Sequence, residues 1–346
     1  MKAMVYQGPG QRQLADVAKP SVRQATDAII KILRTTICGT DLHILQGDLP
    51  EVAAGRILGH EGIGIIEEIG ESVRHFNKGD RVIISCITAC GTCRYCKRAL
   101  PAHCEDGGWI LGHLIDGTQA EYVRIPHADN SLYLLPETVD EDAALMLSDI
   151  LPTGFEIGVL NGKVKPGDTV ALVGAGPVGM AAMLTAQFFT PAKIIVIDKD
   201  EQRLAMAKRY GATEVINPQR QDVTAQIAVL TGGDGVDVAV ECVGVGATFK
   251  ICQDIVAKGG HIANVGVHGK PVDLHLETLW IKNITLTTGL VNTTSTPMLL
   301  KALNHLRVNP NKLVTHRFTL AQLDTAYDVF AHAEQQKAMK VVITAP

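Results

Sequence analysis

Five of the chain's eight cysteines lie between Cys86 and Cys104, in the stretch CITACGTCRYCKRALPAHC. Four of these cysteines follow the spacing C-x2-C-x2-C-x7-C, namely Cys90, Cys93, Cys96 and Cys104. Gaps of two residues let a short loop place thiolates around one tetrahedral Zn(II), and four sulfur ligands leave no position for a substrate. The spacing therefore predicts a structural zinc site that stabilises the fold without reacting.

The same stretch allows two other interpretations. CGTC has the spacing of a redox dithiol, although the two further cysteines at ligand spacing argue against that function. Arg94, Lys97 and Arg98 lie within the loop, as they would in a nucleic-acid-binding finger. Three such charges are ordinarily a solvated loop, and a net charge of -4 offers no general attraction for nucleic acid. We therefore expect no nucleic-acid partner.

A second group of metal-binding residue types is dispersed along the chain. Cys38 stands in ICGTDLH, His60 and Glu61 in LGHEG, and Asp149 in LSDILPTG. Three protein ligands with an open fourth position define catalytic zinc sites. Spacing alone cannot show that distant residues meet, so a buried thiol, a core histidine and a turn aspartate stay open as alternatives.

A glycine-rich turn, GAGPVG, follows the apolar run DTVALV and precedes an apolar helical segment. Gly174 permits a tight turn, Gly176 lets the backbone approach a diphosphate, and Gly179 lets the helix pack on the strand. Pro177 suits the first helical turn, where its missing N–H has no intrahelical partner. A second predicted strand ends at Asp198, where a carboxylate binds adenosine ribose hydroxyls and repels a 2′-phosphate. The sequence thus predicts NAD rather than NADP; a structural turn beside a solvated aspartate is the alternative.

These residues lie in two kinds of predicted structure. Up to about residue 150, segments such as KAMVYQ, AIIKILRTTI, GIGIIEEIG, DRVIIS and AEYVRIP predict a mainly antiparallel β domain. Beyond Leu151, apolar strands alternate with helices, including a helix TFKICQDIVAKGG and a strand GHIANVGV, which is typical of a parallel sheet covered on both faces. From about Thr287 this alternation breaks, and the chain ends in a helix LAQLDTAYDVFAHAE and a strand KVVIT.

The length of 346 residues predicts two domains, and 46% apolar with 20% charged residues is typical of a soluble globular protein. The segment 170–189 is uncharged and long enough to span a membrane. GAGPVG interrupts this segment, which favours a strand, a turn and a buried helix. The start MKAMVYQGPG lacks the features of a signal peptide. We therefore expect a cytoplasmic protein with no membrane partner.

Several motifs together resemble the zinc-containing medium-chain alcohol dehydrogenases over almost the whole chain: GHEGIGIIEEIG followed by GDRV, the cysteine-rich stretch, and GAGPVG. The resemblance implies an α/β protein, with a GroES-like β-rich catalytic domain and a Rossmann domain built on a doubly wound parallel sheet. The implied catalytic domain comprises residues 1–150, with a structural zinc lobe at 86–104, and residues 291–346. The implied Rossmann domain, which binds NAD, comprises residues 151–290.

Carried over position by position, the resemblance implies a catalytic zinc bound by Cys38, His60 and Asp149. With the structural zinc, this makes two zinc ions per chain. Asp149 stands where the animal liver-type enzymes have cysteine, and in this respect the chain resembles bacterial secondary-alcohol and formaldehyde dehydrogenases. Glu61 lies near the metal in this family, where it either approaches the zinc or only orients the site.

The resemblance also implies a proton relay through a hydroxyl, the nicotinamide ribose and a histidine, in which Thr40 provides the hydroxyl and His43 the histidine. A capping threonine and a surface histidine are the alternatives. Trp109 matches a residue of the substrate pocket, with ordinary packing as the alternative. Cys86 is a weaker candidate for the same pocket, and ordinary packing is the favoured explanation for it. Further cofactor contacts are implied for residues of which the valines would otherwise be core, namely Val178, Arg203, Val243, Val265, Val267 and Lys340.

These expectations describe a zinc-dependent alcohol dehydrogenase that transfers hydride reversibly between a small primary or secondary alcohol and NAD. A polyol, threonine or formaldehyde dehydrogenase of the same family is the alternative substrate class. A redox sensor that binds NAD and zinc without turnover is an alternative of another kind. The strand near TLTTGLV pairs with another subunit in this family, so the resemblance implies a homotetramer, with a dimer as the second expectation.

Overall fold

The computed structural model describes residues 1–303 and 309–346, and the chain forms two compact units. Unit 1 contains Met1–Asp149, Asn292–Lys301 and Pro310–Pro346, and unit 2 contains Ile150–Val291. Ala302, Leu303 and Asn309 group with unit 2 because their Cα neighbours are there. This differs from the expectation that all of 291–346 belongs with the first domain.

Unit 2 is built on a sheet of parallel strands in the order β10-β9-β8-β11-β12-β13. The strands are β8 (Thr169–Val173), β9 (Lys193–Ile197), β10 (Glu214–Ile216), β11 (Val236–Glu241), β12 (Val256–Asn264) and β13 (Thr285–Thr288). Its helices are α4 (Ile150–Thr153) with the π-helical turn Gly154–Leu160, α5 (Pro177–Ala186), α6 (Glu201–Tyr210), α7 (Val223–Thr231), α8 (Gly246–Ile255) and α9 (Leu276–Leu279).

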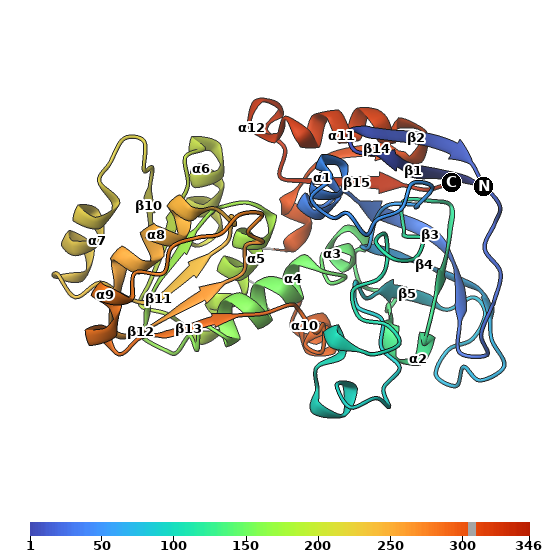
Figure 1. Ribbon diagram of the computed structural model, residues 1–346, viewed down its shortest axis with the longest axis horizontal. Coiled ribbons are helices and arrows are strands. Elements are labelled where there is room, and N and C mark those ends of the chain that lie inside the picture. The colour runs from blue at the N-terminus through green and yellow to red at the C-terminus, as the bar shows by residue number, and fades with distance from the viewer. Residues whose placement is uncertain (304–308) are drawn as a thin grey trace. The chain divides into compact units, whose positions relative to one another are not determined.

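Successive strands of unit 2 are added on opposite sides of β8: β9 and β10 lie on one side, and β11, β12 and β13 lie on the other. The crossovers through α5 and α8 run in opposite directions along the sheet, and right-handed crossovers then place the two helices on opposite faces of the sheet. Figure 1 lets the reader follow these helices from green α5 to orange α9. Covering on both faces explains why β8 and β9 are apolar and buried along nearly their whole length.

Helix α8 ends at Ile255, so the sequence-based helix TFKICQDIVAKGG is too long. The residues from Val256 onward belong to β12, and Val256 pairs with Val236 of β11. Gly259 adopts a φ of 76°, a left-handed value that no right-handed helix accommodates. Strand pairing and this glycine therefore override the helical pattern.

Unit 1 contains a seven-stranded sheet in the order β14-β15-β3-β4-β5-β7, with β6 also paired to β3, and a separate β1–β2 hairpin. The strands are β1 (Lys2–Gly8), β2 (Gln11–Asp16), β3 (Ala28–Thr36), β4 (Gly62–Ile69), β5 (Arg81–Ile84), β6 (Tyr122–Ile125), β7 (Leu132–Leu134), β14 (Val314–Thr319) and β15 (Lys340–Thr344). The helices are α1 (Gly39–Gln46), α2 (Ala128–Ser131), α3 (Glu141–Leu145), α10 (Thr296–Ala302, of which all but Ala302 belongs to this unit), α11 (Leu323–Ala331) and α12 (Ala333–Gln336).

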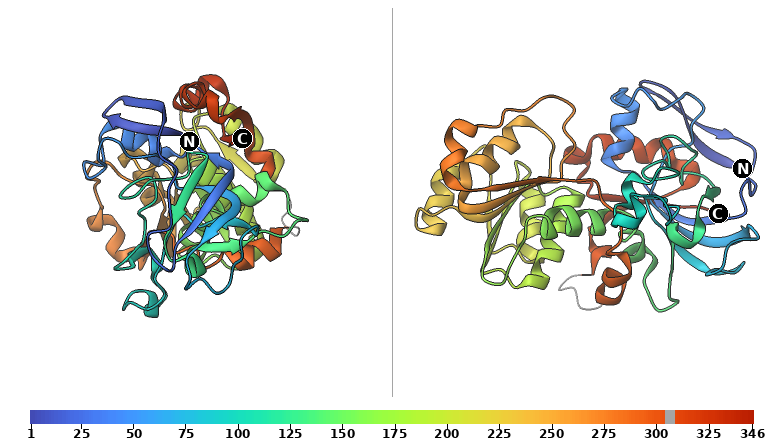
Figure 2. Two further views of the ribbon diagram at one scale, coloured as in Figure 1. Left: turned by 90° about the vertical axis from the view of Figure 1, so that its right-hand side faces the viewer. Right: turned by 60° about the horizontal axis from the view of Figure 1, so that its bottom comes forward.

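The C-terminal segment completes unit 1 through β15, which lies between β14 and β3. Tyr327 of α11 is fully buried in a core that also includes Met4 of β1 and Ile37 at the end of β3. Arg12 of the hairpin binds Asp328 of α11 at 2.7 Å, and Figure 2 shows the red helix beside the blue strands. Residues far apart in the sequence therefore share one core.

Among residues 1–303 and 309–346, no helix has the length and apolar character needed to cross a bilayer. The uncharged segment 170–189 instead forms β8, the glycine-rich turn and α5.

Candidate functional site

The four dispersed residues Cys38, His60, Glu61 and Asp149 meet in unit 1, each offering a ligand atom within 4.8 Å of the others. Their meeting follows from the antiparallel pairing of β3 and β4, in which Thr35 lies opposite Gly62. Cys38 comes directly after β3, and His60 and Glu61 directly before β4, so both segments reach the same end of the sheet. The sequence alone could not show this approach.

The ligand atoms of this group fit a zinc ion. Nε2 of His60 lies 3.2 Å from Oδ2 of Asp149, and the His60 side chain is only 5% exposed. Burial disfavours the imidazolium, but Asp149 and the Cys38 thiolate together raise the pKa of His60 well above its ordinary value. The imidazole and the two acidic groups form a donor set whose negative charge a divalent cation can offset. Thiolate, imidazole and carboxylate are all zinc ligands. The three residues therefore suit a site with a free fourth position.

A buried hydrogen-bond network supports Cys38 from behind, and sequence reasoning missed it. Oδ2 of Asp41 accepts hydrogen bonds from the Cys38 amide at 2.8 Å and from Nε2 of Gln119 at 3.2 Å. The Tyr327 hydroxyl donates to Oε1 of Gln119 at 2.7 Å. The only local signal was Asp41 three residues after Cys38, a spacing that lets its side chain accept from the amide of Cys38, the N-cap residue of α1.

Glu61 makes a buried ion pair with Lys340, in which Nζ lies 2.6 and 2.9 Å from the two carboxylate oxygens. Each side chain is 1% exposed. Burial disfavours the ammonium, but Glu61 and Cys38 outweigh it and raise the pKa of Lys340. The charge of Lys340 is thus directed at the metal-binding group, whereas a contact with the cofactor pyrophosphate stays a prediction.

Cys86 is buried beside the same group, and its thiol donates to Oδ1 of Asp149 at 3.6 Å. Burial, with the charges of Asp149 and Glu61, raises the pKa of Cys86 well above its ordinary value. Cys86 is therefore a protonated neighbour of a metal-ligand candidate, a contact that its sequence context did not indicate. A contact with substrate stays a prediction.

The two relay candidates share one face of α1, since Thr40 and His43 are three residues apart. Thr40 Oγ1 lies 3.8 Å from Cys38 Sγ. His43 bonds through Nδ1 to Asp48 at 2.7 Å, and its side chain is 40% exposed. One residue therefore faces the metal-binding group, and the other reaches solvent.

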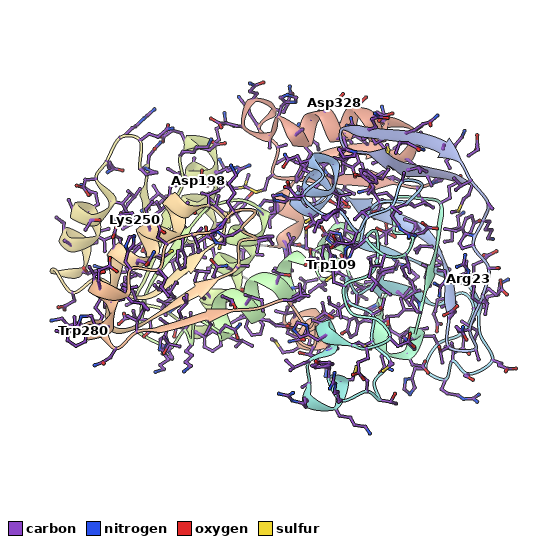
Figure 3. The ribbon with its side chains drawn as sticks, viewed as in Figure 1. Arg23, Trp109, Asp198, Lys250, Trp280 and Asp328 are labelled. Carbon is purple, nitrogen blue, oxygen red and sulfur yellow. The ribbon has the colours of Figure 1, made fainter. Side chains whose placement is uncertain are left out.

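Trp109 stacks on His113, with ring centroids 4.3 Å apart and an interplanar angle of 20°. His113 also bonds through Nε2 to Glu51 at 3.0 Å. Figure 3 labels the half-buried indole within unit 1. This stacking fixes the ring, while its contact with substrate stays a prediction.

The cysteine-rich lobe gathers Cys90, Cys93, Cys96 and Cys104, with all four sulfurs within 4.8 Å of one another. The Sγ atoms of Cys90 and Cys96 are 4.0 Å apart, which excludes a disulfide. Four sulfurs at the usual Zn–S distance of about 2.3 Å form a tetrahedron with edges of about 3.8 Å. Burial opposes ionisation of Cys90, but donors from Thr92 and Cys93 lower the pKa of its thiol to about 6. These sulfurs fit a closed zinc site.

The glycine-rich turn in unit 2 has the shape of a diphosphate cradle. A Cβ on Gly179 would come within 2.0 Å of the Gly174 carbonyl oxygen, and Gly174 itself has a φ of 107°. A Cβ on Gly176 would instead meet only the Arg203 guanidinium, at 3.9 Å. The first and third glycines are thus required by packing, while the backbone at the second is open to a ligand.

Asp198 and the four valine candidates for cofactor contact follow strands of unit 2 or begin the helix after one, whereas Arg203 lies in α6 and Lys340 in unit 1. Asp198 follows β9 and is labelled in Figure 3. Val243 follows β11 and is 47% exposed, and Val267 follows β12 and is 70% exposed. Core packing is therefore the wrong explanation for these two valines, whereas Val178 and Val265 are half-buried. Doubly wound sheets bind nucleotides at the carboxyl ends of their strands, next to the topological switch point, which here lies between β8 and β11.

A doubly wound sheet with a diphosphate turn, together with a thiolate, imidazole and carboxylate group, defines a nucleotide-dependent, zinc-binding oxidoreductase. Family models agree with this class: residues 24–137 match the alcohol dehydrogenase GroES-like domain, and residues 177–305 match the zinc-binding dehydrogenase family. The chain belongs to the zinc-containing medium-chain alcohol dehydrogenase family. It is a zinc-dependent oxidoreductase that acts on alcohols with a nicotinamide cofactor.

Individual relatives cover nearly the whole chain. An alcohol dehydrogenase of Cupriavidus necator is 35% identical over 99% of this chain and 98% of its own length. The apo structure of zinc-dependent alcohol dehydrogenase 2 from Streptococcus pneumonia is 55% identical, with a TM-score of 0.95 over 100% of this chain and 98% of that one. An Escherichia coli alcohol dehydrogenase complexed with NADH is 26% identical, with a TM-score of 0.90 over 99% of both chains.

Proposed function

We propose that this alcohol dehydrogenase oxidises short, uncharged primary or secondary alcohols with NAD, reduces the matching aldehydes and ketones, and uses two zinc ions per chain. The observation that carries the proposal is the presence of two separate ligand groups, one with four thiols and one with Cys38, His60 and Asp149. Four thiolates close a zinc site, whereas three ligands of mixed type leave a position for the alcohol.

The catalytic role falls to the mixed group. The chemistry that zinc supplies when bound is that of a Lewis acid, which lowers the pKa of an alcohol hydroxyl so that hydride leaves readily for the nicotinamide. In the proposed path, Thr40, which lies near Cys38, accepts the alcohol proton, and His43, whose partner is Asp48, releases it to solvent; both contacts support these roles. A sensor without turnover has no need for such a path.

Asp198 supports NAD rather than NADP. Its carboxylate is oriented by two backbone amides, those of Ala175 and Asp200, at 2.7 and 2.8 Å. An oriented anion binds ribose hydroxyls and repels a 2′-phosphate. The nearby Arg203 lies 3.8 Å from Asp200, which already offsets its charge.

The substrate class follows from the apolar side chain of Trp109, beside which a small uncharged alcohol fits better than a polyol. The test measures NADH formation over a panel of ethanol, propan-2-ol, longer homologues, sorbitol, threonine and formaldehyde, with NAD and NADP in parallel. Zinc per chain is measured before and after chelation. We expect about two zinc ions, and loss of activity when the more labile one is removed.

Three results of this test would contradict the proposal. Negligible activity with simple alcohols beside strong turnover of sorbitol, threonine or formaldehyde would overturn the substrate class. Full activity with one zinc per chain would overturn the assignment of two sites. Cofactor binding without turnover of any alcohol would favour a sensor.

We further propose a cytoplasmic homotetramer. Strand β13 is the last in the unit 2 sheet, so one of its edges is unpaired among the described residues. Trp280 and Ile281, which precede this strand, are 71% and 63% exposed, and Figure 3 labels Trp280. An apolar surface beside a free strand edge suits pairing with a second copy. Light scattering that gives a monomer mass would contradict the assembly, and cell fractionation tests the location.

A further inference from the structure

We propose that Lys340 is a positioning residue that keeps the fourth coordination position of the catalytic zinc open by holding the Glu61 carboxylate away from it. The inference rests on the zinc site proposed above. The metal-binding group of unit 1 offers four ligand atoms, and turnover needs only three of them. The inference explains why Glu61 is the one that does not bind the metal.

Sheet topology explains why these two residues flank the metal-binding group. Strand β15 runs antiparallel to β3 with Val342 opposite Thr36, and β4 runs antiparallel to β3 with Gly62 opposite Thr35. The beginnings of β15 and β4 therefore lie on either side of the end of β3, where Cys38 follows. Lys340 begins β15, and Glu61 precedes β4, so the ammonium and the carboxylate meet across 279 residues of sequence.

Glu61 is close enough to serve as a zinc ligand. One of its oxygens lies within 4.8 Å of the ligand atoms of Cys38, His60 and Asp149. A fourth protein ligand would close the tetrahedron, as four thiolates do in a structural site, and would exclude the alcohol. The presence of Glu61 therefore requires something that competes with the metal for its carboxylate.

Lys340 is that competitor. Its ammonium contacts both Glu61 oxygens, at 2.6 and 2.9 Å, and so occupies the two atoms that could otherwise bind the metal. Both side chains are 1% exposed, so water cannot replace either partner. An anion left buried without its partner carries a large desolvation cost, which it relieves by binding another positive charge or by taking up a proton. Without Lys340, the nearest strong positive charge is the metal itself.

The test uses four variants and imidazole as a probe of the open position. Lys340→Met removes the charge and keeps much of the side-chain volume, Lys340→Arg keeps the charge, Glu61→Gln removes the anion, and Lys340→Met/Glu61→Gln removes both. Imidazole binding is measured by the visible absorption of enzyme in which Co(II) replaces the catalytic zinc, and zinc release is measured with a chromogenic chelator. The structural site has no open position and provides the internal reference.

We expect Lys340→Met to bind imidazole at least about tenfold more weakly and to release the catalytic metal more slowly, because Glu61 has become a ligand. The double variant should recover imidazole binding to within about threefold of the wild type, since a neutral amide is a poor zinc ligand. Lys340→Arg should resemble the wild type.

Unchanged imidazole binding in Lys340→Met would overturn the inference. Faster loss of the catalytic metal in that variant would do so as well, because it would give Lys340 a merely structural role. Failure of the double variant to recover binding would have the same meaning. A wild type with only one zinc per chain would instead contradict the zinc site itself, so the two failures are distinguishable.

Discussion

Oδ2 of Asp198 accepts a hydrogen bond from the backbone amide of Ala175 at 2.7 Å. This bond joins the end of β9 to the glycine-rich turn that follows β8. Because Ala175 is fully buried, its amide has no water as an alternative partner. One carboxylate thus fixes the diphosphate turn and is also the group that we expect to bind the adenosine ribose.

Substitution of Asp198 should separate these two roles. Asp198→Asn keeps an oxygen that accepts from Ala175 but removes the charge, so we expect NAD to bind about tenfold more weakly while discrimination against NADP decreases. Asp198→Ala leaves the buried amide unsatisfied and should also lower the free energy of unfolding, by about 1–3 kcal/mol. Cofactor titration and denaturant unfolding measure both quantities. Unaltered NAD preference in Asp198→Asn would contradict the assigned role.

The four-thiol group should contribute stability rather than catalysis. We expect Cys104→Ser to reduce zinc from about two to about one per chain, and to lower the melting temperature by about 5 °C or more, because binding of a structural metal adds to the folding free energy. Cys252→Ala is the control, since Cys252 is buried in the unit 2 core and belongs to neither ligand group. Unchanged zinc content in Cys104→Ser would refute a metal at this lobe.

The sequence predicted best those features whose residues lie close together along the chain. The positions of Gly174 and Gly179 follow from one short motif and that of Asp198 from the end of the next strand, because the turn, the helix start and that strand end lie within one β-α-β unit. The same holds for the four cysteines of the lobe. In both cases the spacing in sequence already limits the distance in space, so the pattern could be interpreted without tertiary structure.

Contacts between distant segments could not be predicted in this way. Cys38 and Asp149 were linked only through the family resemblance, and the Glu61–Lys340 ion pair was not foreseen at all. The sequence indicated only a cofactor contact for Lys340, because its carboxylate partner is 279 residues away. The strand GHIANVGV was predicted, but its start at Val256 was placed within a helix, since pairing with β11 overrides a helical local pattern.

The Thr40 hydroxyl should carry a catalytic proton. We expect Thr40→Val, which has nearly the same shape, to lower kcat at least about a hundredfold, because general acid–base steps contribute about 10²–10⁴-fold. Thr40→Ser retains the hydroxyl and should keep most of the activity. Zinc content and NAD binding should be unaffected in both variants. Equal losses in Thr40→Val and Thr40→Ser, measured by steady-state kinetics, would indicate a packing role instead.

The thiol of Cys86 should be inert in the native enzyme. Burial and the neighbouring Asp149 and Glu61 raise its pKa well above the ordinary value, so the reactive thiolate is scarce at neutral pH, and the side chain is also inaccessible. We expect iodoacetamide at a pH of about 8 to leave Cys86 and the equally buried Cys252 unmodified, as judged by peptide mass spectrometry.

Chelation before alkylation provides the contrast. Removal of the metals should expose thiolates of the lobe, and Cys90 should react early because donors from Thr92 and Cys93, which outweigh its burial, lower the pKa of its thiol to about 6. Cys86 should stay unmodified as long as unit 1 remains folded, which circular dichroism checks. Rapid alkylation of Cys86 in the untreated enzyme would mean that this sulfur is open to small molecules, and the substrate contact implied by the family resemblance would then replace packing as its explanation.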